Sequence, residues 1–308
     1  MSGHEELIAR PFARHFNNVM HSMGRYPVDI KCRGRQMAYE MQNKTLVMDV
    51  SRGVSVYSHK ETRAFPIKFA LAELAWILAM RQDVASIAKF NKNIVHYSDD
   101  TLVMGGAYGK RLGTQVHSAI DRILEDKHTR QACMSIWYPT DASSTSKDHP
   151  CNVMLQFMVR DDELNLTVMA RSSDFITGLP IDAFHWQFLL CLVRNQLRAY
   201  YPELRVGAVT YHMTSLHVYD VDNEAFKSMR EYSAANWHMK ASHYIAVPDS
   251  ATYSSVMLNC MKRFDSCASL DDLVSLFILY PHEKDNIYAL HETFKCRTNK
   301  FVRKGDKA

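Results

Sequence analysis

The chain has 308 residues, of which 47% are hydrophobic and 23% are charged, so it is long enough to bury one large core or two smaller ones. Its net charge of +4 is too small to require a nucleic acid or a membrane surface as a partner, and no apolar run is long enough to span a membrane. The seven cysteines include no pair with metal-site spacing, and the polar, acidic N-terminus does not resemble a signal peptide, so we expect a reduced, cytoplasmic protein.

Three segments in the first third of the chain have clear patterns. Residues 5–24 bring apolar side chains to one face at a period near 3.6 residues, which predicts a helix. Residues 28–57 predict short strands joined by basic turns, and Arg33 lies in the first turn. A strong helical pattern covers residues 67–81 and holds Glu73 between apolar neighbours. Burying a carboxylate without a partner is costly, so Glu73 either lies at the rim of the core or has a function.

The middle of the chain alternates loops with apolar runs. A glycine-rich loop at 105–113 contains Tyr108 but lacks the spacing of a phosphate-binding P-loop. A helix is predicted over 114–125, and Arg130 precedes a predicted strand at 132–137. Taken singly, none of these features assigns a function.

The stretch Asp148–Phe157 is the most informative in the chain. It places Cys151 directly after a proline, at the start of an apolar run typical of a buried strand. An isolated cysteine at such a place is most often a packing residue. Further along, however, Arg171 adds a guanidinium and Asp182 adds a carboxylate. Together the three groups are a candidate nucleophile (Cys151), a candidate binding group for an anion (Arg171) and a candidate polar group that recognises the substrate (Asp182).

The predicted elements that follow are a helix over 183–199 and a strand over 206–211 that leads to His217 and Tyr219. Residues two apart on a strand share one face, so these two side chains can bind one ligand group together. The alternative for His217 is a purely structural role. Another helix is predicted over 269–280.

Four motifs taken together resemble the thymidylate synthase family. They are Pro150–Cys151, Arg171–Ser172–Ser173–Asp174, Gly178–Leu179–Pro180–Ile181–Asp182 and Thr214–Ser215–Leu216–His217–Val218–Tyr219. With weaker similarities around Glu73, Tyr108 and Arg130, the resemblance covers residues 65–220. It implies an α+β fold in which a mixed β-sheet packs with helices and one sheet face is used for dimerisation. We expect a catalytic domain over 1–245 and a C-terminal helical extension with a basic tail over 246–308.

The resemblance also implies residue roles at a nucleotide site. Arg33 and Arg171 would bind the phosphate, and Ser172 would bind the substrate. Arg130 would reach into the partner subunit's phosphate site, so that a homodimer shares its active sites. For Arg33 the alternative is a surface arginine in a turn. His217 and Tyr219 would bind the sugar.

Glu73 and Tyr108 would belong with Cys151 and Asp182 to the catalytic set, with Glu73 ordering water at the pyrimidine. Asp174, Val95 and Gly178 would contact the co-substrate, 5,10-methylenetetrahydrofolate.

The chemistry implied by the resemblance begins with the Cys151 thiolate. Its addition at pyrimidine C6 makes C5 a carbon nucleophile, which attacks the methylene group of the folate. Nearby arginines would lower the pKa of the thiol. Once the C5 proton is lost, hydride gives a methyl group and water gives a hydroxymethyl group. The family has a shielding tryptophan where this chain has Val95, so we expect water to reach the intermediate.

Asp182 stands where the synthases have asparagine, as in the deoxycytidylate hydroxymethylase branch of the family. A carboxylate accepts from the N4 amino group of cytosine, and its ionised form cannot donate to O4 of uracil. The alternative is that Asp182 only caps the helix that follows.

We therefore expect a dCMP 5-hydroxymethyltransferase without membrane or nucleic-acid partners. The alternatives are a dUMP hydroxymethylase, a thymidylate synthase, an enzyme that uses CMP instead of dCMP, and a catalytically silent homologue that binds nucleotide or RNA.

Overall fold

The computed structural model of the chain describes residues 12–32, 34–57, 64–235 and 242–292. Arg33 and the predicted basic tail lie outside these residues. Within them, no helix combines the length and the apolar character that crossing a membrane requires.

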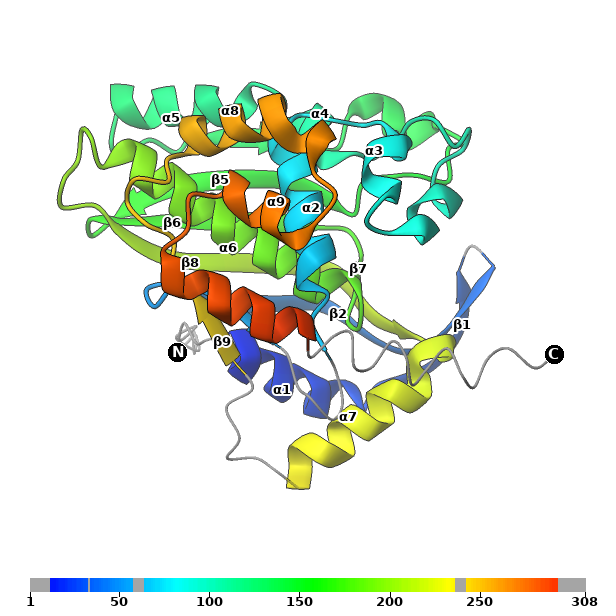
Figure 1. Ribbon diagram of the computed structural model, residues 1–308. Helices are drawn as coiled ribbons and strands as arrows, with labels where there is room; N and C mark the ends of the chain where they lie inside the picture. The colour runs from blue at the N-terminus through cyan, green and yellow to red at the C-terminus, as the bar shows by residue number, and fades with distance from the viewer. Residues whose placement is uncertain (1–11, 33, 58–63, 236–241, 293–308) are drawn as a thin grey trace.

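A mixed β-sheet forms the centre of the molecule (Figure 1). The strands β6–β8 and β7–β8 pair in parallel, and all other neighbours are antiparallel. The predicted α+β class with a mixed sheet is confirmed. The order across the sheet is β1 (Pro27–Cys32), β2 (Arg35–Asp49), β8 (Arg205–Tyr219), β6 (Glu163–Ala170), β5 (Asn152–Arg160) and β4 (Cys133–Ser135). The short strand β7 (Ser173–Asp174) also pairs with β8. A separate two-stranded sheet consists of β3 (Val54–Tyr57) and β9 (Ser242–Ile245).

Helices and short 3₁₀ turns connect the strands. The α-helices are α1 (Phe12–Met23), α2 (Ile67–Leu78), α3 (Val84–Ala88), α4 (Tyr108–Leu112), α5 (Gln115–Glu125), α6 (Gly178–Leu197), α7 (Asn223–Ala235), α8 (Tyr253–Arg263), α9 (Leu270–Leu276) and a last helix at 281–292. The 3₁₀ turns are η1 (Lys92–His96), η2 (Pro139–Ser143), η3 (Asp220–Asp222) and η4 (Phe264–Ser266).

Two element predictions need correction. We expected short strands over 28–57, but β2 runs unbroken for 15 residues because it pairs with β8 along most of its length. We expected the long helix to begin at 183, but α6 begins at Gly178. Pro180 does not prevent this, because proline is tolerated in the first turn of a helix, where backbone N–H groups have no helical acceptor.

Helix α6 crosses one face of the sheet and is buried along most of its length (Figure 1). Side chains alternate across β6, so Leu164, Leu166 and Val168 are fully buried on one face while Met169 is 38% exposed on the other. One face of the sheet therefore carries the core, and the opposite face is partly open.

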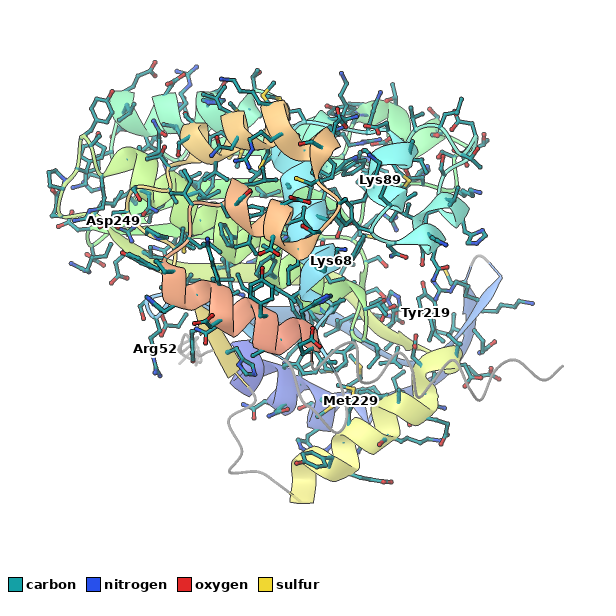
Figure 2. The ribbon with its side chains drawn as sticks, viewed as in Figure 1. Arg52, Lys68, Lys89, Tyr219, Met229 and Asp249 are labelled. Atoms are coloured by element: carbon teal, nitrogen blue, oxygen red, sulfur yellow. The ribbon has the colours of Figure 1, made fainter. Side chains whose placement is uncertain are left out.

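The segment after residue 246 packs on the same core. Helices α8 and α9 both contact α2, and α8 also contacts α6. Two lysines that Figure 2 labels support this packing: Lys68 Nζ donates to the Ala268 carbonyl at 3.0 Å, and Lys89 Nζ donates to the Asp265 carbonyl at 3.3 Å. The boundary at 245/246 stays a prediction.

Candidate active site

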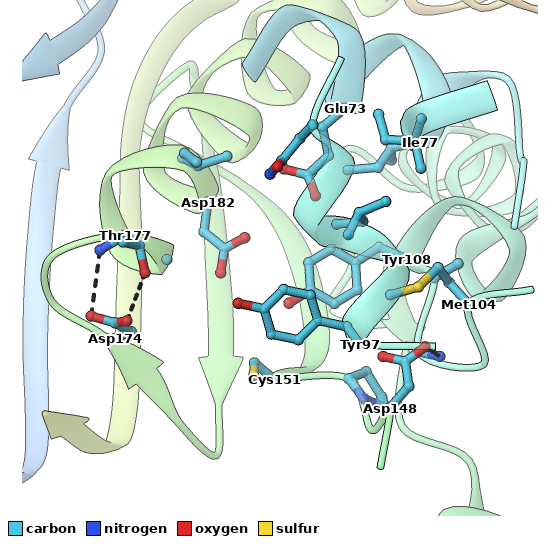
Figure 3. Close-up of a pocket in the computed structure, with 18 of the residues that line it drawn as sticks. Glu73, Ile77, Tyr97, Met104, Tyr108, Asp148, Cys151, Asp174, Thr177 and Asp182 are labelled. Atoms are coloured by element: carbon cyan, nitrogen blue, oxygen red, sulfur yellow. Dashed lines mark hydrogen bonds between the residues drawn. The ribbon is translucent and has the colours of Figure 1, made fainter. Parts of the chain in front are cut away.

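A cavity of about 340 Å³ opens between α2, η1 and α4 on one side and the segments around Cys151 and Asp182 on the other (Figure 3). It collects residues that are distant in the sequence. The predicted site residues that line it are Glu73, Tyr108, Cys151, Ser172, Asp174, Gly178 and Asp182.

Arg171 holds the loop that carries Cys151. Its Nε donates to the Pro150 carbonyl at 3.0 Å and its Nη2 donates to the His149 carbonyl at 3.1 Å. Its backbone N–H donates to the Cys151 carbonyl at 3.0 Å. Among the described residues, the guanidinium Nη1 has no hydrogen-bond acceptor, so this nitrogen can still bind an anion.

The thiol of Cys151 is less acidic than we expected. Burial raises its pKa to about 11, and the positive charge of Arg171 offsets only part of this effect. Arg171 lowers the pKa as predicted, but the net shift in the chain without nucleotide is upward. Desolvation outweighs the one guanidinium nearby, and Asp182, Asp148 and Asp174 raise the pKa further.

Asp182 belongs to a buried polar cluster. Asn152 Nδ2 donates to Asp182 Oδ2 at 3.0 Å, and the Tyr211 hydroxyl lies 2.9 Å from the same oxygen and 2.6 Å from Asn152 Oδ1. Asn152 and Tyr211 are fully buried. The alternative of a helix cap is wrong, since Asp182 lies inside α6 and Thr177 holds the cap position. Burial raises the pKa of Asp182 to about 6.

Glu73 and His185 face each other but do not form an ion pair at neutral pH. Burial raises the pKa of Glu73 to about 8, and the nearby charge of Asp182 adds to this effect. Burial also lowers the pKa of His185 to about 4. Nε2 of His185 lies 3.0 Å from the Ala70 carbonyl and 3.8 Å from Glu73 Oε2. The neutral histidine therefore donates to Ala70 and leaves the Glu73 carboxyl facing the cavity.

Gly109 allows α4 to approach α2 closely enough to bring Tyr108 beside Glu73. A Cβ atom at Gly109 would lie 2.4 Å from the Ile77 carbonyl oxygen, well inside contact distance. The Tyr108 ring packs against Trp186 with ring centroids 5.7 Å apart. Burial raises the pKa of the Tyr108 hydroxyl well above its ordinary value, so it enters the site as a neutral group.

The segment around Val95 presents other side chains to the cavity than the one we predicted. Asn91, Ile94 and Tyr97 line the cavity, and Val95 does not. The reason is the 3₁₀ geometry of η1, in which side chains three residues apart point the same way. Tyr97, which we had not singled out, is therefore the aromatic side chain that this segment presents to the cavity (Figure 3).

His217 and Tyr219 form a second cluster, which β7 connects to the cavity. Asp174 pairs with His217 across β7 and β8, and the His217 and Tyr219 rings meet edge to face at 4.7 Å. The guanidinium of Arg35 lies 3.5 Å from the centre of the Tyr219 ring. Arg35 also was not singled out from the sequence. Asp174 itself accepts from Thr177 Oγ1 at 2.6 Å and so stabilises the start of α6 (Figure 3).

Arg130 does not line the cavity, and its reach into a partner subunit stays a prediction. It is exposed just before β4, and its carbonyl accepts from Gln156 Nε2 at 2.8 Å. The cavity has one further acid that we had not singled out. Asp148 accepts from the Gly106 backbone N–H at 2.8 Å, and burial raises its pKa.

Comparisons with known proteins agree with this geometry. The family model described as thymidylate synthase matches residues 14–246. A deoxyuridylate hydroxymethyltransferase of Bacillus phage SP01 is 33% identical over 173 residues, which is 49% of this chain and 43% of that protein. A thymidylate synthase of Lactococcus lactis subsp. cremoris (strain SK11) is 25% identical over 205 residues, which is 63% of this chain and 71% of that protein.

Among solved structures, thermostable thymidylate synthase A from Bacillus subtilis superimposes with a TM-score of 0.60 at 21% identity, over 72% of this chain and 84% of that one. This likeness concerns the fold. The sequence match to the phage hydroxymethyltransferase spans less than half of that relative's length. The family match, in contrast, takes in both halves of the cavity and the whole sheet. The chain belongs to the thymidylate synthase family.

Proposed function

We propose that the protein is a pyrimidine nucleotide C5 hydroxymethyltransferase and that its substrate is dCMP. The observation that carries this proposal is Asp182. Its Oδ2 is engaged by Asn152 and Tyr211, whereas its Oδ1 accepts no hydrogen bond from the described residues and remains open to the cavity. An oxygen acceptor there suits the N4 amino group of cytosine and repels O4 of uracil.

Enzymes of this family transfer a one-carbon unit from 5,10-methylenetetrahydrofolate to a pyrimidine, as we predicted. The cavity suits such a co-substrate, because Ile77, Ile94, Met104 and Tyr97 give it apolar walls for flat rings. When bound, the folate supplies the carbon of the new C5 substituent. Asp174 and Gly178 are the further contacts that we propose for it.

We assign the residues of the chain as follows. Cys151 adds to C6 of the base, and Arg171 Nη1 and Ser172 hold the phosphate. His217 and Tyr219 hold the sugar. Glu73 and Tyr108, both neutral at the start of the reaction, orient water and protons at the base.

A hydroxymethyl product needs water at the reacting carbon. Tyr97 supports this outcome because it is 53% exposed and brings a hydroxyl to the cavity wall, where it can hold a water molecule.

The proposal includes a homodimer that uses the open face of the sheet. Met154, Gln156, Met158 and Met169 are half-buried or exposed along β5 and β6, opposite the face that α6 covers. Methionine is enriched at protein–protein interfaces, so a sheet face with several accessible methionines suits contact with a second copy. Arg130 lies just before β4, at this edge of the sheet, from which it could reach a partner's phosphate site.

The second candidate is a dUMP hydroxymethyltransferase. It is favoured by the names of relatives that are 33% and 31% identical, from Bacillus phage SP01 and Pseudomonas phage M6. A neutral Asp182 that turned its proton toward the cavity would serve uracil, so the state of this carboxyl separates the two candidates.

The test is to incubate the protein with CMP, dCMP, UMP or dUMP and methylenetetrahydrofolate, and to weigh the products. We expect hydroxymethylated dCMP. The Asp182→Asn variant should turn its amide oxygen toward the Asn152 donor and its NH₂ toward the base, which favours uracil. Leaving a buried donor or acceptor without a partner costs about 1–3 kcal/mol, so the dUMP/dCMP ratio of kcat/KM should rise by about tenfold. If the folded variant kept the wild-type ratio, Asp182 would not read the base.

A further inference from the structure

We propose that Tyr211 and Asn152 are positioning residues for substrate specificity: they hold the acid proton of Asp182 on its inner oxygen, Oδ2, so that Oδ1 offers the base an acceptor only. The inference rests on the proposed function in one respect, which is that Asp182 faces the base. It explains how a buried carboxyl group that keeps its proton can still distinguish cytosine from uracil.

The argument begins with three contacts in a closed ring. Asp182 Oδ2 lies 3.0 Å from Asn152 Nδ2 and 2.9 Å from the Tyr211 hydroxyl oxygen, which lies 2.6 Å from Asn152 Oδ1. Each contact needs one hydrogen atom to be a hydrogen bond. Asn152 supplies one of them from its amide nitrogen, and Tyr211 supplies one from its hydroxyl. The third hydrogen can come only from Asp182.

This count does not depend on how the amide of Asn152 is oriented. If its oxygen and nitrogen were exchanged, one ring contact would still involve the nitrogen and one the oxygen, so the amide would again supply a single hydrogen. With an ionised Asp182, two oxygen atoms would face each other without a hydrogen between them. Such a contact in a fully buried site is costly, because neither atom can turn to water instead.

The surroundings of the ring favour the neutral acid. The three residues come from β5, β8 and α6, so the sheet and the central helix fix their positions. The titratable groups that face Asp182 are Tyr211 from β8, Glu73 from α2, Tyr108 from α4 and Cys151 from the loop before β5. Each of these groups is neutral when protonated and negative when ionised, so none of them adds a positive charge that would favour an ionised Asp182. Burial raises the pKa of Asp182 and outweighs the hydrogen bonds from Asn152 and Tyr211, which lower it.

The position of the proton decides specificity. A neutral carboxylic acid that is free to rotate could present its O–H to O4 of uracil, just as an amide presents its N–H. With the proton held between Oδ2 and Tyr211, the cavity meets only the lone pairs of Oδ1. Cytosine can donate to these from N4, and uracil cannot.

Isotope-edited infrared spectroscopy tests directly whether Asp182 is protonated. The protein carries ¹³C-labelled aspartate carboxyls and is measured without nucleotide, and subtracting the spectrum of the Asp182→Asn variant isolates the band of Asp182. We expect its protonated band to be present at pH 6, where ordinary aspartates are ionised. Tyr211→Phe should move its titration to lower pH by about one pH unit, because the acid loses its acceptor. The same variant should raise the dUMP/dCMP ratio of kcat/KM about fivefold to tenfold.

Tyr201→Phe is the matched control. It removes a hydroxyl that donates to the Ile123 carbonyl at 3.0 Å, away from the cavity, and should change neither readout. An ionised Asp182 at pH 6 in the wild type would overturn the inference, even if Tyr211→Phe failed to fold. A shift to higher pH in Tyr211→Phe would also overturn it, because Tyr211 would then be a donor to a carboxylate. A wild-type preference for dUMP would instead refute the proposed function, and the infrared result would still decide where the proton lies.

Discussion

Replacing Glu73 with glutamine should stabilise the protein at neutral pH while impairing its activity. The folded chain raises the pKa of Glu73 from an ordinary value of 4.5 to about 8, mainly by burial. Between these two values the folded state keeps a proton that the unfolded state releases, so the free energy of unfolding falls as the pH rises. Each pH unit costs about 1.4 kcal/mol, so by pH 7 the wild type loses roughly 3 kcal/mol that the Glu73→Gln variant keeps.

Urea unfolding at a series of pH values from 4.5 to 8 measures this difference. The gap between variant and wild type should be smallest at pH 4.5 and should widen toward pH 8. Glu224→Gln is the control, because Glu224 is 88% exposed on α7 and its removal should leave the pH dependence unchanged. Parallel curves for Glu73→Gln and wild type would show that Glu73 ionises in the folded chain as an ordinary carboxyl does, and the reasoning from burial would fail.

Two further predictions concern the cavity. Cys151→Ala should abolish both turnover and the release of tritium from C5 of a labelled nucleotide, because both steps need the bond to C6; tritium release by the folded variant would remove Cys151 from the mechanism. Tyr97→Ala should raise KM for the folate about tenfold, since an aromatic wall is lost, whereas Val95→Ala should leave KM unchanged. Equal effects of the two substitutions would contradict the orientation of η1 described above.

The order of the motifs in the sequence was enough to predict many of the residues that form the site. Cys151, Arg171, Asp174, Gly178 and Asp182 were predicted as one site, and all of them line the cavity or hold the loop beside it. This worked because their motifs lie at the ends of strands and at the start of a helix, and the sheet brings these ends together.

What escaped prediction depends on side-chain direction and burial. Tyr97 was missed because a 3₁₀ turn presents every third side chain, and nothing in the sequence separates this turn from an α-helix or a loop. Tyr211 was missed because it alternates with polar neighbours on β8 like any core residue of a strand. The pKa of Cys151 was wrong in direction because a sequence names the neighbouring arginines but not the amount of water that the fold removes.

The raised pKa values also bear on how the nucleophile is activated. With a pKa of about 11, only about one Cys151 thiol in ten thousand is ionised at pH 7, so a standing thiolate is not available in the empty site. Arg171 directs two of its nitrogens to the carbonyls of the loop, and a bound phosphate would neutralise the charge that remains. We therefore expect the thiol to lose its proton to a water molecule in the site as the sulfur bonds to C6. Burial keeps Glu73, Tyr108 and Cys151 neutral at pH 7, so these three groups do not repel an anionic nucleotide as it binds.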